Sequence, residues 1–144
     1  MRLGDPATGD SLDLRVVAYE FPDLVGEEYD SDWLVIEGSV TSGDRSWTFR
    51  EPCLLVGEAE ALGRWLTERD AAAIDFIEPL LEFSIDGSGD DLVLRVSLGA
   101  EAVEAGTDPF ERVNLRIAAT PAEIAAAADD WQGRLNGFPA RGIA

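Results

Sequence analysis

The segment "LLEFSIDGSGDDLVLRVSLGAE", residues 80–101, predicts the fold class of this chain. Apolar and mostly polar positions alternate over residues 81–86 and again over residues 92–98, which is the period of a half-buried β-strand. The stretch "GSGD", residues 87–90, stands between them and favours a tight turn. The segment is therefore expected to form an antiparallel β-hairpin with one apolar and one polar face.

Further strand patterns stand on both sides of this hairpin. Residues 111–120 repeat the alternation, and residues 12–19, 32–40 and 45–50 show it earlier in the chain. The last two of these segments are joined by "TSGD", whose Gly43 suits a hairpin turn. The sequence therefore predicts about six strands.

Two segments have the period of a helix instead. Residues 57–70 carry apolar side chains at helical spacing, and so do residues 120–138. The second segment opens with Thr120 as N-cap, Pro121 at the first helical position and Glu123 to complete a capping box. The expected buried stripes are Leu62, Trp65 and Leu66 in the first helix, and Ile124, Ala128, Trp131 and Leu135 in the second.

These elements predict an α+β fold in the order βββαβββα. Strict alternation is typical of an antiparallel sheet with one covered face, so we expect a single sheet of about six strands with both helices packed on one face. We expect one domain over residues 1–144, with residues 1–11 as a flexible N-terminal lead-in. The polar open face of the sheet should carry Arg15, Glu82, Ser84, Arg95, Ser97, Asn114 and Arg116.

The charge of the chain excludes several classes of partner. With 29 acidic residues, 11 basic residues that are all arginine and no histidine, the formal net charge is −18. Such a field repels nucleic acids and anionic membranes and attracts basic proteins.

The N-terminal residues lack the apolar core of a signal peptide, and no apolar run approaches the roughly 18 residues that a membrane span needs. A cytoplasmic location is expected.

The residue types also limit the chemistry. Without histidine, neither a Ser-His-Asp nor a Cys-His nucleophile can be assembled. The single cysteine, Cys53, precedes an apolar run and is expected to be a buried structural residue. No cofactor site is indicated. Weak calcium binding through Glu28, Asp30 and Asp32 is an alternative, but a solvated loop is favoured because nothing in the pattern fixes the geometry of a site.

Two acids are candidates for burial. Glu78 stands between Ile77 and Pro79, and Glu101 follows a strand end. A buried carboxylate needs a hydrogen-bonded partner, and an arginine would serve. A structural Glu–Arg pair is favoured over an acid–base pair of a carboxylate enzyme.

Residues 20–32, here called the acidic loop, hold six carboxylates and no basic residue. Two tryptophans in the neighbouring hairpin, Trp33 and Trp47, are expected in the core, but either would anchor an interface beside these acids if it were exposed. Trp65 and Trp131 are expected in the core. The candidate partner-binding residues are Asp23, Glu27, Glu28, Tyr29, Asp30, Asp32, Trp33 and Trp47.

Six segments together resemble one known family. They are "YDSDWLVIEGSV", "RSWTFREPCL", "LGRWL", "FIEPLLEF", "LRVSLGAE" and "LNGFPAR". In this order they are similar to the WapI family of bacterial immunity proteins, and the resemblance runs from about Leu12 to Arg141.

The resemblance implies a cytosolic, non-catalytic protein that binds and neutralises the toxic domain of a secreted polymorphic toxin. In the namesake system that toxin is a nuclease acting on tRNA. A nuclease presents positive charge to phosphate, so the acidic loop would act as a phosphate mimic with Tyr29 and Trp33 as anchors. An acidic protein-interaction or scaffold domain and a carboxylate-based enzyme are the alternatives.

Overall fold

The computed structural model describes residues 1–108 and 110–142. The strands are β1 (Arg2–Asp5), β2 (Asp10–Tyr19), β3 (Trp33–Ser42), β4 (Arg45–Leu55), β5 (Ala73–Ile74), β6 (Leu81–Ser88), β7 (Asp91–Leu98) and β8 (Val113–Ala119). The helices are α1 (Val56–Glu68) and α2 (Pro121–Leu135), with the 3-10 turns η1 (Asp30–Asp32) and η2 (Ala100–Ala102).

The strands form two antiparallel sheets, sheet A in the order β1-β2-β3-β4 and sheet B in the order β5-β6-β7-β8. The α+β class is confirmed, but the prediction of a single six-stranded sheet is wrong. The alternation of apolar residues reports which face of a strand is buried and not which strands are neighbours. Helix α1 follows β4 and leads to β5, so the chain leaves sheet A and starts sheet B instead of extending it.

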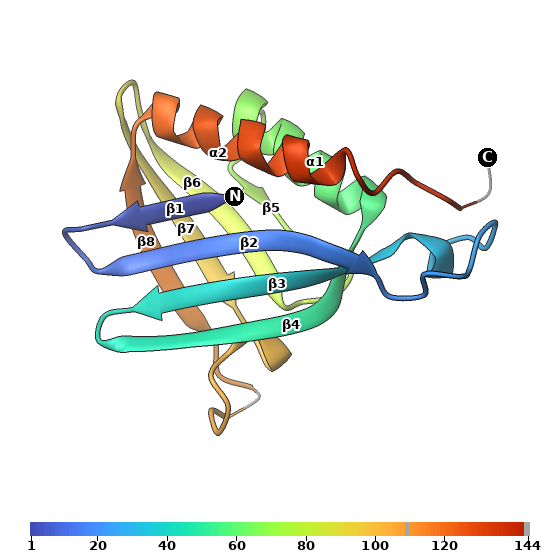
Figure 1. Cartoon of the computed structure of the whole chain (residues 1–144). Coiled ribbons are helices and arrows are strands. Elements are labelled where there is room, and N and C mark those ends of the chain that lie inside the picture. Colours follow the sequence, from blue (N-terminus) through green and yellow to red (C-terminus); the bar gives the residue numbers. More distant parts are fainter. Residues whose placement is uncertain (109, 143–144) are drawn as a thin grey trace.

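The apolar faces of both sheets enclose one core together with the helices. In Figure 1 the two helices lie side by side along the top of the two sheets. The predicted stripes of both helices are buried, each residue being at most 4% exposed. Trp131 joins the helices because its indole N–H donates to the carbonyl oxygen of Ala59 in α1 at 2.8 Å.

The capping box predicted at the start of α2 is present. The Thr120 hydroxyl accepts the backbone N–H of Glu123 at 3.2 Å, and the Glu123 carboxylate accepts the backbone N–H of Thr120 at the same distance. These bonds satisfy two of the amide groups that every helix start leaves unpaired.

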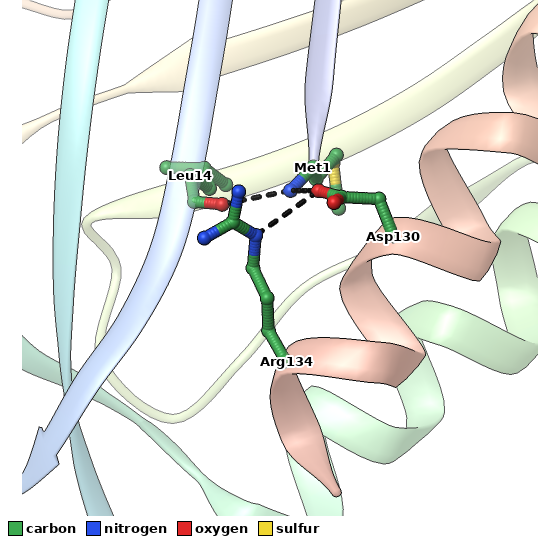
Figure 2. Close-up of polar contacts among 4 residues, drawn as sticks. All are labelled: Met1, Leu14, Asp130 and Arg134. Atoms are coloured by element: carbon green, nitrogen blue, oxygen red, sulfur yellow. Dashed lines mark hydrogen bonds and ion pairs between the residues drawn. The ribbon is translucent and has the colours of Figure 1, made fainter. Parts of the chain in front are cut away.

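The N-terminal residues are not the flexible lead-in that the sequence predicted. Strand β1 pairs with β2, and Met1 is fully buried. As Figure 2 shows, the Met1 ammonium donates to the carbonyl oxygen of Leu14 at 2.8 Å and to the Asp130 carboxylate at 2.6 Å, which Arg134 also contacts. Too few residues precede the turn at Gly9 for periodicity to reveal a four-residue strand.

The pKa values of Met1 and Asp130 are both lowered in this ion pair, but for different reasons. Burial lowers the pKa of the Met1 ammonium in spite of the carboxylate beside it, because the amine has lost its hydration. The hydrogen bond from the ammonium, followed by that from Arg134, lowers the pKa of Asp130. Asp130 stays partly exposed and keeps much of its hydration, so for this group attraction outweighs burial.

The turn between β1 and β2 joins sheet A to sheet B. Strand β8 is an edge of sheet B, and its outward backbone groups need partners that no neighbouring strand supplies. The Asp5 carboxylate accepts the N–H of Ala118 at 2.9 Å, and the Asp10 carboxylate accepts the N–H of Arg116 at 2.9 Å. The hydroxyl of Thr8 donates to the carbonyl oxygen of Arg116 at 3.1 Å. Side chains of one turn therefore stand in for a neighbouring strand along β8.

Asp5 is 6% exposed and is the buried acid of this junction. Its second carboxylate oxygen accepts the N–H of Ala7 at 2.9 Å. The hydrogen bond from Ala118, then that from Ala7, lowers the pKa of Asp5 below its usual 3.8. Because the folded-state pKa is lowered, the stabilisation is present above the unfolded-state pKa and is lost as the pH falls through the folded-state value.

We expect Asp5→Asn to lower the free energy of unfolding at pH 7, because an amide can offer an acceptor to only one of the two N–H groups and turns a donor toward the other. The difference from wild type should shrink as the pH falls below the unfolded-state pKa of about 3.9, because the unfolded wild-type chain then binds a proton that the folded carboxylate does not yet bind. Urea unfolding followed by tryptophan fluorescence between pH 2 and 7 measures both. Asp44→Asn, at an exposed hairpin turn, is the control. A pH-independent difference would contradict the prediction.

Candidate functional site

The acidic loop is organised around Arg141. The guanidinium of Arg141 donates to the carbonyl oxygens of Pro22 at 2.7 Å, Phe21 at 2.9 Å and Ser31 at 3.1 Å. It also lies 3.5 Å from the centre of the Tyr19 ring, which is a close cation–π contact. One arginine thus binds both ends of the loop through the loop's own backbone.

Backbone bonds complete this attachment. The Asp32 carboxylate accepts the N–H groups of Arg141 at 2.6 Å and of Gly142 at 3.0 Å, and the N–H of Gly26 donates to the Arg141 carbonyl oxygen at 2.8 Å. Ser31 is fully buried, and its hydroxyl accepts the N–H of Glu27 at 2.8 Å. Asp32 is therefore a structural residue, and the other acids of the loop stand on a fixed backbone.

The outer surface of the loop combines acids with apolar side chains. Phe21, Val25 and Tyr29 are 43%, 67% and 56% exposed. The backbone of Tyr29 has a positive φ of 65°, which is costly for a residue with a side chain, and such strained conformations recur at binding sites. The exposed acids of this surface are Asp23, Glu27, Glu28 and Asp30.

A hollow of about 330 Å³ lies where the loop meets the start of α1. Glu28, Tyr29 and Asp32 line it from the loop, and Glu58 lines it from the helix. The Glu58 carboxylate is already bonded, since it accepts the N–H groups of Leu55 at 3.0 Å and Ile77 at 2.8 Å. The hollow is acidic with an aromatic wall, which suits a basic side chain.

One further acid, Glu78, adjoins the loop. Burial, then the charges of Asp30 and Glu78, raises the pKa of Glu20. Glu78 follows Ile77, whose N–H donates to Glu58 at the hollow that Tyr29 also lines. The acidic surface therefore extends past residues 20–32 to the segment that precedes β6.

The structure separates the two tryptophans proposed as anchors. Trp33 is half-buried at the exit of the loop and pairs in register with Leu55, which borders the hollow. Trp47 pairs with Val40 at the other end of the same two strands. The indole N–H of Trp47 donates to the Ala102 carbonyl oxygen at 2.9 Å, so this residue attaches β4 to η2 and lies away from the acidic loop.

The two acids predicted to be buried differ in their exposure. Glu101 is exposed and Glu78 is half-buried, so the prediction of burial is wrong for Glu101. A chain often leaves the core at the end of a strand, and the apolar residues next to Glu101 in the sequence do not reveal this. The buried acid is Asp5, in a turn whose sequence "DPATGD" shows no large apolar neighbours that would have suggested burial.

Cys53 is 1% exposed, as expected for a structural thiol. In the part of the chain that the structure describes, no group of three His, Cys, Asp or Glu side chains is arranged to hold a metal ion. Within the same residues, no helix is long and apolar enough to cross a membrane.

Comparison with known families places the chain. The family model described as the immunity protein WapI-like family matches residues 2–139. The chain belongs to this family. Neither the search of curated proteins nor the search of solved structures gave a match. Membership of the WapI-like family suggests toxin immunity, a protein toxin as partner and a role without catalysis.

For this WapI-like protein, we expect Arg141→Gln to loosen the acidic loop. The substitution removes the hydrogen bonds from the guanidinium to three carbonyl oxygens. A hydrogen bond to a charged group contributes about 1.5–3 kcal/mol to stability. Amide hydrogen exchange of Gly26 and Ser31 should accelerate about tenfold or more. Arg134→Gln on α2 is the matched control, and unchanged exchange in the Arg141 variant would show that the loop is held by other contacts.

Cys53 should be unreactive in the folded protein. Burial, followed by the charges of Glu51 and Glu58, raises the pKa of its thiol from 9.0 to about 12. At pH 8 the thiolate fraction is then about a thousandfold lower than for a free thiol. Alkylation by iodoacetamide should be slow in buffer and fast in guanidinium chloride, and equal rates would contradict the burial of this residue.

Proposed function

We propose that this protein is an immunity protein that binds and neutralises a cognate nuclease-type toxin domain through its acidic loop. Family membership supports the immunity role. The acidic loop is proposed as the binding surface because Arg141 fixes its backbone while its acids and aromatic side chains face solvent.

The rigidity of the loop matters for affinity. A flexible acidic segment would lose conformational entropy on binding, whereas a loop held in place has already lost it on folding. Tyr29 and Phe21 offer apolar contact area next to the acids, as aromatic residues commonly do at the centres of interfaces.

The charge distribution suits a basic partner. A nuclease must gather positive charge where it binds phosphate, and carboxylates at similar spacing bind the same arginines and lysines. The net charge of −18 would also steer such a partner toward the protein. The acidic loop would therefore occupy the substrate site of the toxin. The neighbouring hollow would receive a basic side chain of the toxin.

The alternatives fit the surface less well. A self-assembling scaffold would bury a large apolar patch, but three of the exposed large apolar side chains lie among the acids of the loop. Two identical loops would repel one another. A carboxylate enzyme would need two acids of opposed pKa in one cleft, whereas Glu20, whose pKa is raised, stands among acids that also face solvent.

The test is binding to the toxin domain encoded directly upstream of the gene, made catalytically inactive by mutation. We expect nanomolar affinity by calorimetry, and affinity that falls as salt rises. Combined replacement of Glu27, Glu28 and Asp30 by Lys should slow association about tenfold or more at low salt.

Asp32 is left unchanged in that variant because it binds the backbone of Arg141 and Gly142. The matched control replaces three exposed acids elsewhere, Glu68, Asp90 and Asp129, by Lys, and should retain most of the association rate. Equal losses in both variants would mean that only net charge matters. Absence of binding by the wild-type protein would refute the proposed function.

A further inference from the structure

The two sheets have four edge strands, and three of them are protected from pairing with another chain. Strand β1 has four residues and β5 has two, which is very short for an edge that would accept a further strand. The side chains of Asp5, Thr8 and Asp10 bond to the outward backbone groups of β8. The fourth edge, β4, has 11 residues and is the outermost strand of sheet A in Figure 1.

The backbone of β4 presents a row of unpaired groups. A two-residue turn sets Ser42 against Arg45, and the two residues of such a pair exchange both of their hydrogen bonds. Because the bonds alternate along an antiparallel pair, Ser46, Thr48 and Arg50 direct their N–H and carbonyl groups away from β3. Among the residues that the structure describes, none bonds to these backbone groups. They remain able to pair with an added strand.

A groove of about 470 Å³ lies along this row. Residues 48–51 of β4 line one side of it, and the segment of residues 100–107, which contains η2, lines the other. The indole N–H of Trp47 donates to the Ala102 carbonyl oxygen at 2.9 Å, so the second wall is attached to β4. An extended segment in this groove would therefore meet the unpaired backbone groups of β4 on one side.

The charges of the groove leave it acidic. Its charged side chains are Arg50, Glu51, Glu101 and Glu104. Glu104 pairs with Arg45 at 2.8 Å and Arg50 pairs with Glu37 at 3.3 Å, so both of these charges are compensated. Glu51 and Glu101 form no ion pair among the described residues, and they leave two negative charges for an occupant to match.

We propose that the edge of β4 is a second contact surface for the toxin domain, on which an extended basic segment of the toxin pairs with β4 as an added strand and directs arginine or lysine toward Glu51 and Glu101. The inference rests on the proposed function. Backbone bonds would hold any extended chain, whereas the two acids select a basic one. A second copy of this chain fits less well, because two molecules of net charge −18 repel each other.

The same strand leads from the groove to the acidic loop. Glu51 lines the groove, and Leu55, four residues further along β4, lines the hollow beside the loop. At about 3.3 Å per residue, the two positions lie roughly 13 Å apart. Pro52, which has no N–H, ends the row of donors between them. One toxin domain can therefore contact both the loop and the edge of β4.

The experiment follows amide hydrogen exchange along β4 with and without the inactive toxin domain. In the free protein the amides of Trp47 and Phe49, which bond to β3, should exchange slowly, and those of Ser46, Thr48 and Arg50 should exchange fast. The toxin domain should slow exchange of the second set about tenfold or more. Unchanged exchange of that set in a complex that does form would overturn the inference and leave the proposed function intact. Absence of toxin binding by wild type would overturn both proposals.

Thr48→Pro tests the backbone pairing directly. It removes an N–H that points away from β3, a position at which an edge strand tolerates proline. Thr48→Ala is the matched control, because it shortens the same side chain and keeps the N–H. We expect the proline variant to bind the toxin domain about fivefold or more weakly and the alanine variant to bind as wild type does. Thermal unfolding confirms that both are folded, and equal affinities of the folded variants would contradict the pairing.

Glu51→Gln combined with Glu101→Gln tests the basic character of the occupant. This variant should bind the toxin domain about threefold or more weakly at low salt. The matched control, Glu68→Gln with Asp129→Asn, removes two exposed acids of the helices and should lose less. Equal affinities of the two variants would overturn the choice of a basic segment. A dimer in sedimentation of the free protein, with slow exchange of the outward amides of β4, would make a second copy the occupant and overturn the inference.

Discussion

Two carboxylates in one turn determine how the sheets of this protein are joined. Asp5 and Asp10 accept the outward N–H groups of Ala118 and Arg116, so that the edge of sheet B is bonded to sheet A without a shared strand ladder. An edge strand with unpaired backbone groups is costly when covered and a risk for aggregation when exposed. The junction removes both problems. It also fixes β8, from which α2 continues, and so the position of the helix whose Trp131 contacts α1.

Polar side chains that satisfy backbone groups recur at the candidate site. Arg141 binds three carbonyl oxygens of the acidic loop, Asp32 binds two N–H groups of the C-terminal segment, and Glu58 binds two more near the start of α1. The chain has 29 acidic residues, and these bonds divide them into two kinds. Some acids hold the backbone, and the exposed acids of the loop are left free to contact a partner. The surplus of negative charge is therefore not evenly available for binding.

Family membership and surface chemistry support one function from different directions. The WapI-like family suggests toxin immunity, and the acidic loop with its exposed aromatic residues suits the basic surface of a nuclease.

The sequence by itself determined the local structure and the buried faces. Alternation located the strands from β2 onward except the two-residue β5, helical spacing located both buried stripes, and the residues at the start of α2 specified its capping box. The family was also readable from motifs spread along the chain. These signals are local, because periodicity records which side of a segment meets the core.

Only the tertiary structure decided which segments are neighbours. It showed two sheets instead of one, a bonded strand at residues 2–5, Trp47 far from the acidic loop, and Glu101 in solvent. It also showed that Arg141 organises a loop more than a hundred positions earlier, and that Asp5 is buried against β8. Nothing in the spacing of a lone arginine or aspartate specifies its partner. Such contacts depend on how the whole chain closes, and that is set by the packing of all the elements together.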